Sequence, residues 1–248
     1  MFMSVVAPVP GVAVYPELAG ARVLITGLSS TAGVDTGRAF ADHKTRLVLA
    51  TTDTSPAMTE LVSHLAQEAS EIRLFQDPMG ADPIRLTQNA VQAFSGLDAV
   101  VNFVTLSVAD LEGRETKREI EDYVAAKLAP VLDVTRVAAN RMSLTWTEGS
   151  ILNVVLMPQP ATAREAALSG FARTALAAMT KGEAKAAAER AVRINAIGPR
   201  STAASEAAGA CLSSGPEIAS LALHLASRKG RQLSGHMFDA EEIALRAC

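Results

Sequence analysis

The sequence predicts a single-domain α/β fold: a Rossmann-like, doubly wound parallel sheet of about seven strands with helices on both faces. Short apolar runs alternate with longer segments of helical periodicity along almost the whole chain. This alternation is typical of parallel strands joined by crossover helices. The 248 residues, 49% of them hydrophobic, suffice for one large core, and no repeat or linker divides them.

The expected strands are short runs rich in β-branched and other apolar residues, which suit the interior of a parallel sheet. They are 23–26, 46–50, 71–75, 99–104, 150–156 and 192–197, and 237–239 could add a last one. Periodicity near 3.6 predicts helices at 35–43, 58–68, 82–94, 119–142, 163–188 and 216–227. Pro130 should kink the fourth helix without splitting it. We expect residues 1–20 to form an N-terminal arm and 21–248 the domain.

Composition excludes several functional classes. A net charge of -3 and a pI near 5.9 provide no basic field for nucleic acid or for anionic lipid. No apolar stretch reaches the ~18 residues that a membrane span needs. Cys211 and Cys248 predict free thiols, and the four histidines lack ligand spacing, so we expect no metal. The protein is expected to be cytoplasmic.

A glycine-rich turn follows the first expected strand, with T-G-L-S-S-T-A-G at residues 26–33. Further motifs lie in the same register: L-D-A-V-V-N at 97–102, G-S-I-L-N at 149–153, R-I-N-A-I-G-P at 193–199 and P-E-I-A at 216–219. Together they resemble the motifs of the short-chain dehydrogenase/reductase family, from about Tyr15 to Asp239. The resemblance implies the Rossmann fold predicted above.

The resemblance also implies where catalytic residues would lie. Active members use a tyrosine as acid, a lysine one helical turn later, a serine that polarises the carbonyl, and an asparagine. These positions fall at Ser169, Arg173, Leu156 and Lys127. A serine hydroxyl is far too weak an acid to replace a phenol, arginine stays protonated, and leucine has no polar atom. We therefore expect no catalytic residue, only vestigial positions that pack or form ion pairs.

The nucleotide site is altered in a similar way. The turn keeps Gly27 and Gly33, but Thr31 replaces the glycine that lets the pyrophosphate approach. Thr51 stands at the residue that selects NAD or NADP, and Asp53 is expected to cap the next helix. The vestigial nucleotide positions, none of which we expect to bind a cofactor, are Gly27, Thr31, Gly33, Thr51, Asp77 and Asn102.

These substitutions predict a non-catalytic subunit. The segment 200–215 is also shorter than the substrate lid of active members, and Glu242 and Ile243 replace their usual glycines near the C-terminus. We expect a hetero-oligomer, a tetramer, with a catalytically active paralogue that binds NAD and oxidises a substrate of the β-hydroxyacyl-CoA type. The resemblance extends to degenerate subunits of this kind in anaerobic toluene catabolism.

Two alternatives stay open. The chain could be an NAD(P)-binding sensor or regulatory module, since Gly27, Gly33 and Asp77 are kept. It could also be an active NAD(P)-dependent reductase in which Lys127 or Arg173 has a new role. The chain has only two tyrosines, Tyr15 and Tyr123, and neither is placed by the motifs to replace the missing acid.

Overall fold

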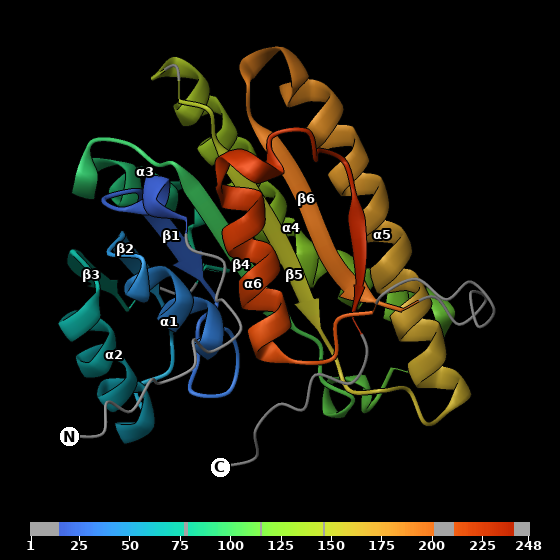
Figure 1. Ribbon diagram of the computed structural model, residues 1–248. Helices are drawn as coiled ribbons and strands as arrows, with labels where there is room; N and C mark the ends of the chain where they lie inside the picture. The colour runs from blue at the N-terminus through green and yellow to red at the C-terminus, as the bar shows by residue number, and fades with distance from the viewer. Residues whose placement is uncertain (1–14, 77–78, 115, 146, 201–210, 241–248) are drawn as a thin grey trace, which may run out of the picture.

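The strands form one parallel sheet, as predicted. The computed structural model describes residues 15–240 except 77–78, 115, 146 and 201–210. Within these ranges the sheet has seven strands in the order β3-β2-β1-β4-β5-β6-β7 (Figure 1). Their bounds are β1 Arg22–Thr26, β2 Arg46–Ala50, β3 Glu71–Phe75, β4 Ala99–Thr105, β5 Ser150–Leu156, β6 Arg193–Pro199 and β7 Met237–Ala240.

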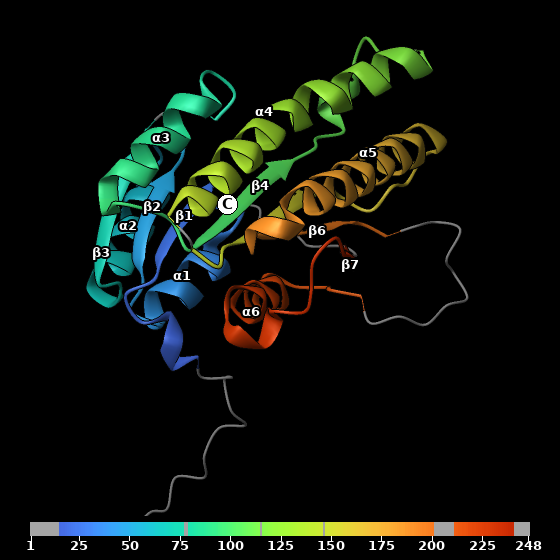
Figure 2. The ribbon, with the colours of Figure 1, turned by 90° about the horizontal axis from the view of Figure 1, so that it is seen from above.

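Six longer helices in the described ranges cover the two faces of the sheet. Figure 2 shows α3, α4 and α5 in one layer and α1 and α6 on the opposite side of the sheet, with α2 packed on α1. All six lie within two residues of their predicted bounds. They are α1 Val34–Asp42, α2 Pro56–Glu68, α3 Pro83–Phe94, α4 Lys117–Leu144, α5 Ala163–Ala187 and α6 Gly215–Ala226. Short 3-10 helices, which the sequence did not predict, include Pro16–Leu18 and Ala109–Leu111.

Side-chain caps explain where the long helices begin. Thr116 caps α4 in a capping box with Glu119, and Thr162 caps α5 through the backbone N–H of Glu165. Helix α4 continues through Pro130 without being split, as predicted. These caps fix the first turns of α4 and α5, the helices that carry three of the positions that the family motifs assign to catalysis.

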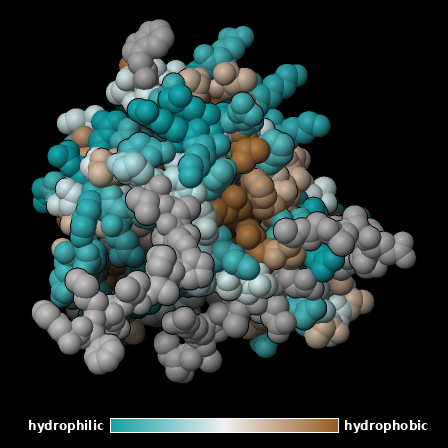
Figure 3. All heavy atoms as spheres, in the orientation of Figure 1, coloured by the Kyte–Doolittle hydropathy of each residue, from teal (hydrophilic) through white to brown (hydrophobic). Residues whose placement is uncertain are grey.

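The core lies on both faces of the central strands. Every residue of β5 and β6 is buried, whereas the edge strands β3 and β7 are largely half-buried or exposed. Tyr15 and Leu18, from the expected N-terminal arm, are each only 4% exposed and pack into the core cluster of α1, α2 and α6. On the surface, Figure 3 shows apolar side chains gathered beside α6, over the β6 and β7 side of the sheet.

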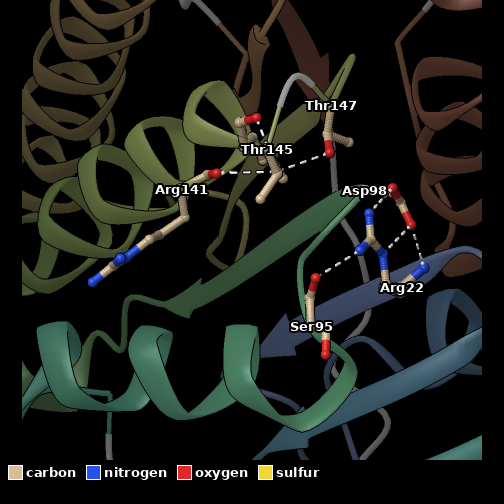
Figure 4. Close-up of polar contacts among 7 residues, drawn as sticks. Arg22, Ser95, Asp98, Arg141, Thr145 and Thr147 are labelled. Carbon is tan, nitrogen blue, oxygen red and sulfur yellow. Dashed lines mark hydrogen bonds and ion pairs between the residues drawn. The ribbon is translucent and has the colours of Figure 1, made fainter.

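An ion pair joins the start of β1 to the residue before β4, at the end of the sheet where the strands begin (Figure 4). Arg22 donates from Nε and Nη2 to the two carboxylate oxygens of Asp98, at 2.8 and 2.7 Å, and from Nη1 to the carbonyl of Ser95 at 3.0 Å. The backbone N–H of Arg22 donates to Asp98 as well, at 2.8 Å. Burial alone would raise the pKa of Asp98, but the hydrogen bonds from Arg22 outweigh it and hold the pKa below its usual value.

In open α/β folds, ligands bind at the opposite end of the sheet, where the strands end. The strand order reverses between β1 and β4, and the crevice outside their carboxyl ends is the usual ligand position. These ends point toward the lower part of Figure 1. In the described ranges no helix combines the length and apolar composition that a membrane span requires.

Candidate functional site

A small pocket occupies the crevice predicted by the topology. Its volume is about 220 Å³, somewhat below the roughly 300–1,000 Å³ of typical small-molecule sites. It is formed by the turn after β1, the ends of β4 and β5, and the start of α6. The lining residues are Thr31, Ala32, Gly33, Val34, Asp35, Thr36, Phe103, Leu156, Ser213, Ser214, Gly215, Pro216 and Ile218. Of the predicted positions that the structure describes, Thr31, Gly33 and Leu156 line it, and the others do not.

The turn after β1 lies directly against Phe103. Gly27 and Gly33 both have positive φ, +67° and +78°. A Cβ added to Gly27 would lie 2.1 Å from the carbonyl oxygen of Phe103, and one added to Gly33 would lie 2.9 Å from its ring. The Phe103 side chain is only 3% exposed. The two retained glycines are therefore required by the turn conformation and by the close packing of β4.

Three backbone donors of this turn already have side-chain acceptors. Ser29 Oγ accepts from the N–H groups of Thr31 and Ala32, at 3.3 and 3.0 Å, and lies 3.2 Å from Thr31 Oγ1. The N–H of Ser30 donates to the carboxylate of Asp53 at 2.7 Å. Backbone N–H groups of such a turn are what a dinucleotide site offers to a pyrophosphate.

Asp53 is not the helix cap that the sequence predicted. Ser55 caps α2, accepting from the N–H of Met58 at 3.2 Å. Asp53 instead bridges two loops, because its second oxygen accepts from the N–H of Ser55 at 2.9 Å while the first accepts from Ser30. Hydrogen bonds from Ser55 and then from Ser30 hold the pKa of Asp53 well below its usual value. Local spacing could not reveal this, since Ser30 is 23 residues away.

Thr51, at the cofactor-selecting position, connects the same two loops. Its hydroxyl donates to the carbonyl of Leu28 at 2.5 Å and accepts from the N–H of Asp53 at 3.0 Å. The side chain is buried, at 3% exposure. Thr51 thus ties the end of β2 to the glycine-rich turn.

A second carboxylate, which the sequence analysis did not single out, lines the pocket itself. Asp35 lies in the first turn of α1 and close to the start of α6, where a Cβ added to Gly215 would meet its Oδ2 at 2.1 Å. A negative charge near helix N-termini is favourable. The pocket wall therefore carries the chain's own anion beside the hydroxyl groups of Thr31, Thr36 and Ser214.

The predicted positions on β4 and β5 are Asn102 and Leu156, and both are packed within the fold. Leu156 is buried at 4% exposure and contributes an apolar wall to the pocket. Asn102 is fully buried, accepts from Thr26 Oγ1 at 2.7 Å and donates to Asn153 Oδ1 at 2.8 Å. Thr135 of α4 donates to the same Asn153 oxygen at 3.2 Å. Asn102 thus links three neighbouring strands through side chains and does not line the pocket.

Ser169 and Arg173 share a face of α5 but do not line the pocket. Ser169 is 2% exposed. Arg173 Nη1 donates to Asp239 Oδ1 at 2.5 Å and to the carbonyl of Pro199 at 2.7 Å. Helix α5 is thereby connected to β7 and to the end of β6. Sequence reasoning missed Asp239, which lies 66 residues from Arg173.

Lys127 belongs to a polar cluster around Tyr123 of the same helix. Lys127 Nζ lies 3.3 Å from Asp110 Oδ2, and the Tyr123 hydroxyl donates to the same oxygen at 2.6 Å. Arg114 lies over the Tyr123 ring, with its guanidinium carbon 4.8 Å from the centroid. Burial, followed by the hydrogen bond to Asp110, raises the pKa of Tyr123 well above its usual value. A phenol in this position is a poor proton donor near neutral pH.

Some predicted features cannot be placed. Asp77 lies outside the described residues, as does most of the 200–215 segment. Within the described part of the chain, no group of three or more His, Cys, Asp or Glu side chains is arranged to hold a metal ion.

Comparison with known proteins assigns the family. The family model "short chain dehydrogenase" matches residues 21–211. Carbonyl reductase [NADPH] 2 of Sus scrofa is 27% identical over 205 residues, covering 82% of this chain and 80% of the relative. A short-chain dehydrogenase of Oenococcus oeni superposes with a TM-score of 0.69 at 22% identity, covering 90% of this chain and 96% of that one. The citronellol catabolism dehydrogenase of Pseudomonas aeruginosa gives 0.70 at 19%, covering 92% and 96%. The chain belongs to the short-chain dehydrogenase family of oxidoreductases.

Proposed function

We propose that this chain is a non-catalytic subunit that assembles with a catalytically active short-chain dehydrogenase. The observation that carries the proposal is the state of the lysine position: Arg173 forms an ion pair with Asp239 at 2.5 Å. A cation engaged in this way is not available to lower the pKa of a neighbouring acid. The tyrosine position carries Ser169, which is buried, and the serine position carries the apolar Leu156.

We further propose that NAD binds to the partner and not to this chain. The described residues do not fit a dinucleotide at the glycine-rich turn. Ser29 and Asp53 accept from three N–H groups of the turn that would face a pyrophosphate, and the carboxylate of Asp35 would repel it. The Phe103 ring packs against Gly33, where a cofactor would approach the turn.

The outer face of α5 supports the assembly part of the proposal. Gly170, Thr174, Ala178 and Gly182 recur every four residues and are all exposed. A Cβ added to either glycine would meet nothing within 4 Å in the described chain. Glycine costs a helix about 1 kcal/mol relative to alanine, and the fold of this chain alone gives no reason for that cost. Close approach of a helix from another subunit would explain it.

The active partner is proposed to oxidise a β-hydroxyacyl-CoA with NAD, in a heterotetramer. An enzyme of this design is the 2-[hydroxy(phenyl)methyl]-succinyl-CoA dehydrogenase of anaerobic toluene degradation, and the present chain resembles its inactive subunit. The resemblance supplies the substrate class, because the pocket of this chain has no group that singles out CoA.

The test is purification of the native protein with whatever binds it, followed by native mass spectrometry. We expect a hetero-oligomer containing a second short-chain dehydrogenase with an intact tyrosine and lysine. The complex should reduce NAD, and the present chain alone should not. Ala178→Arg, on the outer face of α5, should dissociate the complex. The control is Ala57→Arg, which adds the same charge to an exposed alanine of α2 and should leave the complex intact.

Two results would contradict the proposal. One is a stable homo-oligomer of this chain that turns over a carbonyl substrate with NADPH, the cofactor named for the Sus scrofa relative. Loss of that rate in Lys127→Ala would then favour a reductase with relocated residues. The other is tight NAD(H) or NADP(H) binding that is weakened by a substitution in the turn, which would favour a sensor.

A further inference from the structure

A carboxylate of the chain itself is bound to the glycine-rich turn. Asp53, in the loop after β2, accepts from the backbone N–H of Ser30 at 2.7 Å through one oxygen and from that of Ser55 at 2.9 Å through the other. Ser30 belongs to the turn after β1, and Ser55 is the N-cap of α2. Backbone N–H groups in turns that lead into helices are the donors that proteins commonly use to hold phosphate groups. The chain therefore holds Asp53 in the way in which it would hold a phosphate.

The negative charge of Asp53 is compensated by hydrogen bonds and not by a cation. The contacts that hold its pKa well below its usual value come from Ser55 and then from Ser30, and no cationic side chain of the described residues contributes. Asp35 adds a second carboxylate on the wall of the neighbouring pocket. Like charges a few Å apart repel strongly where water is partly excluded. A diphosphate that entered the turn would thus meet uncompensated negative charge.

The loop that carries Asp53 is itself fixed against the turn. Thr51 donates to the carbonyl of Leu28 at 2.5 Å and accepts from the N–H of Asp53 at 3.0 Å. In dinucleotide-binding folds, an acidic residue about 20 residues after the turn accepts from a ribose hydroxyl. Asp53 follows Ser30 by 23 residues, but both of its oxygens accept from backbone N–H groups of the protein. It cannot turn away from the turn without losing these two hydrogen bonds.

We propose that Asp53 closes the glycine-rich turn as an internal competitor of the diphosphate of a dinucleotide. The inference rests on the proposed function, because it names the residue that keeps NAD from this chain. Gly27 and Gly33 keep positive φ values, so the backbone of the turn stays in place when the carboxylate is removed. Thr31 and Phe103 narrow the space beside the turn, but neither carries a charge. The block at Ser30 is then a single side chain.

The experiment is titration of NADH, followed by its fluorescence, into the purified natural chain, Asp53→Ala and Asp53→Asn. Asp53→Ala removes the charge and frees the N–H of Ser30, and it should bind NADH at least about tenfold more tightly than the natural chain. Asp53→Asn keeps the size of the side chain and should also bind more tightly than the natural chain. Sodium pyrophosphate should displace the NADH, because the place that opens is that of the diphosphate.

The matched control is Asp82→Ala, which removes the same charge from another loop. Asp82 accepts from the backbone N–H of Arg85 at 2.9 Å and caps α3, in the other helix layer of Figure 2. This variant should bind NADH no better than the natural chain does. Circular dichroism should show that all three variants fold, and Asp53→Asn decides the question if Asp53→Ala does not.

Four results would overturn the inference. Absence of a gain in the Asp53 variants would do so and would leave the proposed function intact. An equal gain in Asp82→Ala would indicate only net charge or looser loops, and NADH that pyrophosphate does not displace would lie elsewhere. The fourth is tight binding of NADH by the natural chain that weakens in Asp53→Ala. Asp53 would then accept from the ribose, and this result alone would contradict the proposed function as well.

Discussion

The ion pair between Arg173 and Asp239 allows a quantitative test of the idea that the lysine position has become structural. The two side chains are 27% and 28% exposed, and the Nη1–Oδ1 distance is 2.5 Å. Hydrogen bonds between charged groups contribute about 1.5–3 kcal/mol. Partial exposure weakens them, since fully exposed pairs contribute about 0–1 kcal/mol. We therefore expect a coupling free energy of about 1–2 kcal/mol.

The assay is a double-mutant cycle with Arg173→Met, Asp239→Asn and the combined variant. Free energies of unfolding come from urea titrations monitored by circular dichroism. Arg173→Met should cost more than Asp239→Asn, because it also removes the hydrogen bond to the carbonyl of Pro199. For a chain of this size each kcal/mol lowers the Tm by roughly 2–4 °C.

A measured coupling below about 0.5 kcal/mol, a value typical of exposed pairs, would refute a structural role for Arg173. That result would mean that Arg173 is free to contact a ligand, as the lysine does in active relatives. Repeating the cycle in 0.5 M salt provides a control, because a partly buried pair should keep most of its coupling when exposed pairs are screened.

Three further perturbations follow from the contacts described above. Asp98→Asn should destabilise the chain by about 2 kcal/mol at pH 7, because Arg22 would keep only neutral acceptors. The pKa of Asp98 is lowered in the folded state, so its contribution to stability is present above about pH 4 and is lost as the pH falls further. In urea titrations from pH 7 to pH 3, the free energies of unfolding of the natural chain and of Asp98→Asn should therefore converge. Asp53→Asn should cost about 1 kcal/mol and lose the same kind of acid sensitivity, because the pKa of Asp53 is also lowered; thermal unfolding at pH 7 and pH 3 checks this. Gly27→Ala should cost at least about 2 kcal/mol, since the new Cβ would strike the backbone of Phe103 at a positive φ; an unchanged Tm would contradict the described turn.

The fold was predictable because its signals are local. Strands β2, β3 and β5 have their predicted bounds, since runs such as R-L-V-L-A at 46–50 suit a strand buried on both faces whatever their partners are. Helix bounds followed from 3.6-residue periodicity. The 3-10 helix Pro16–Leu18 and its contribution to the core were missed, because Tyr15 and Leu18 belong to a core cluster formed mainly by residues far along the chain.

The site was less predictable because its contacts join residues far apart in the chain. Leu156 and Gly33, which the motifs assign to the site, both line the pocket, because Leu156 ends β5 and Gly33 lies in the turn after β1. They could not show that Asp53 would accept a hydrogen bond from Ser30. The position of Asp53 in the sequence suggests a helix cap, and only the folded chain brings the glycine-rich turn beside it. The same applies to Asp239, whose strand had to pair beside β6 before its carboxylate could reach α5.

Three polar groups at positions that the family motifs assign to the site have partners within the chain. Arg173 pairs with Asp239, Lys127 with Asp110, and the N–H of Ser30 with Asp53. An enzyme must leave such groups available to substrate and cofactor, and it accepts lower stability there in return. Here the same positions contribute hydrogen bonds and ion pairs to the fold itself. A chain selected for assembly with an active partner, and not for turnover, would be expected to use its vestigial positions in this way.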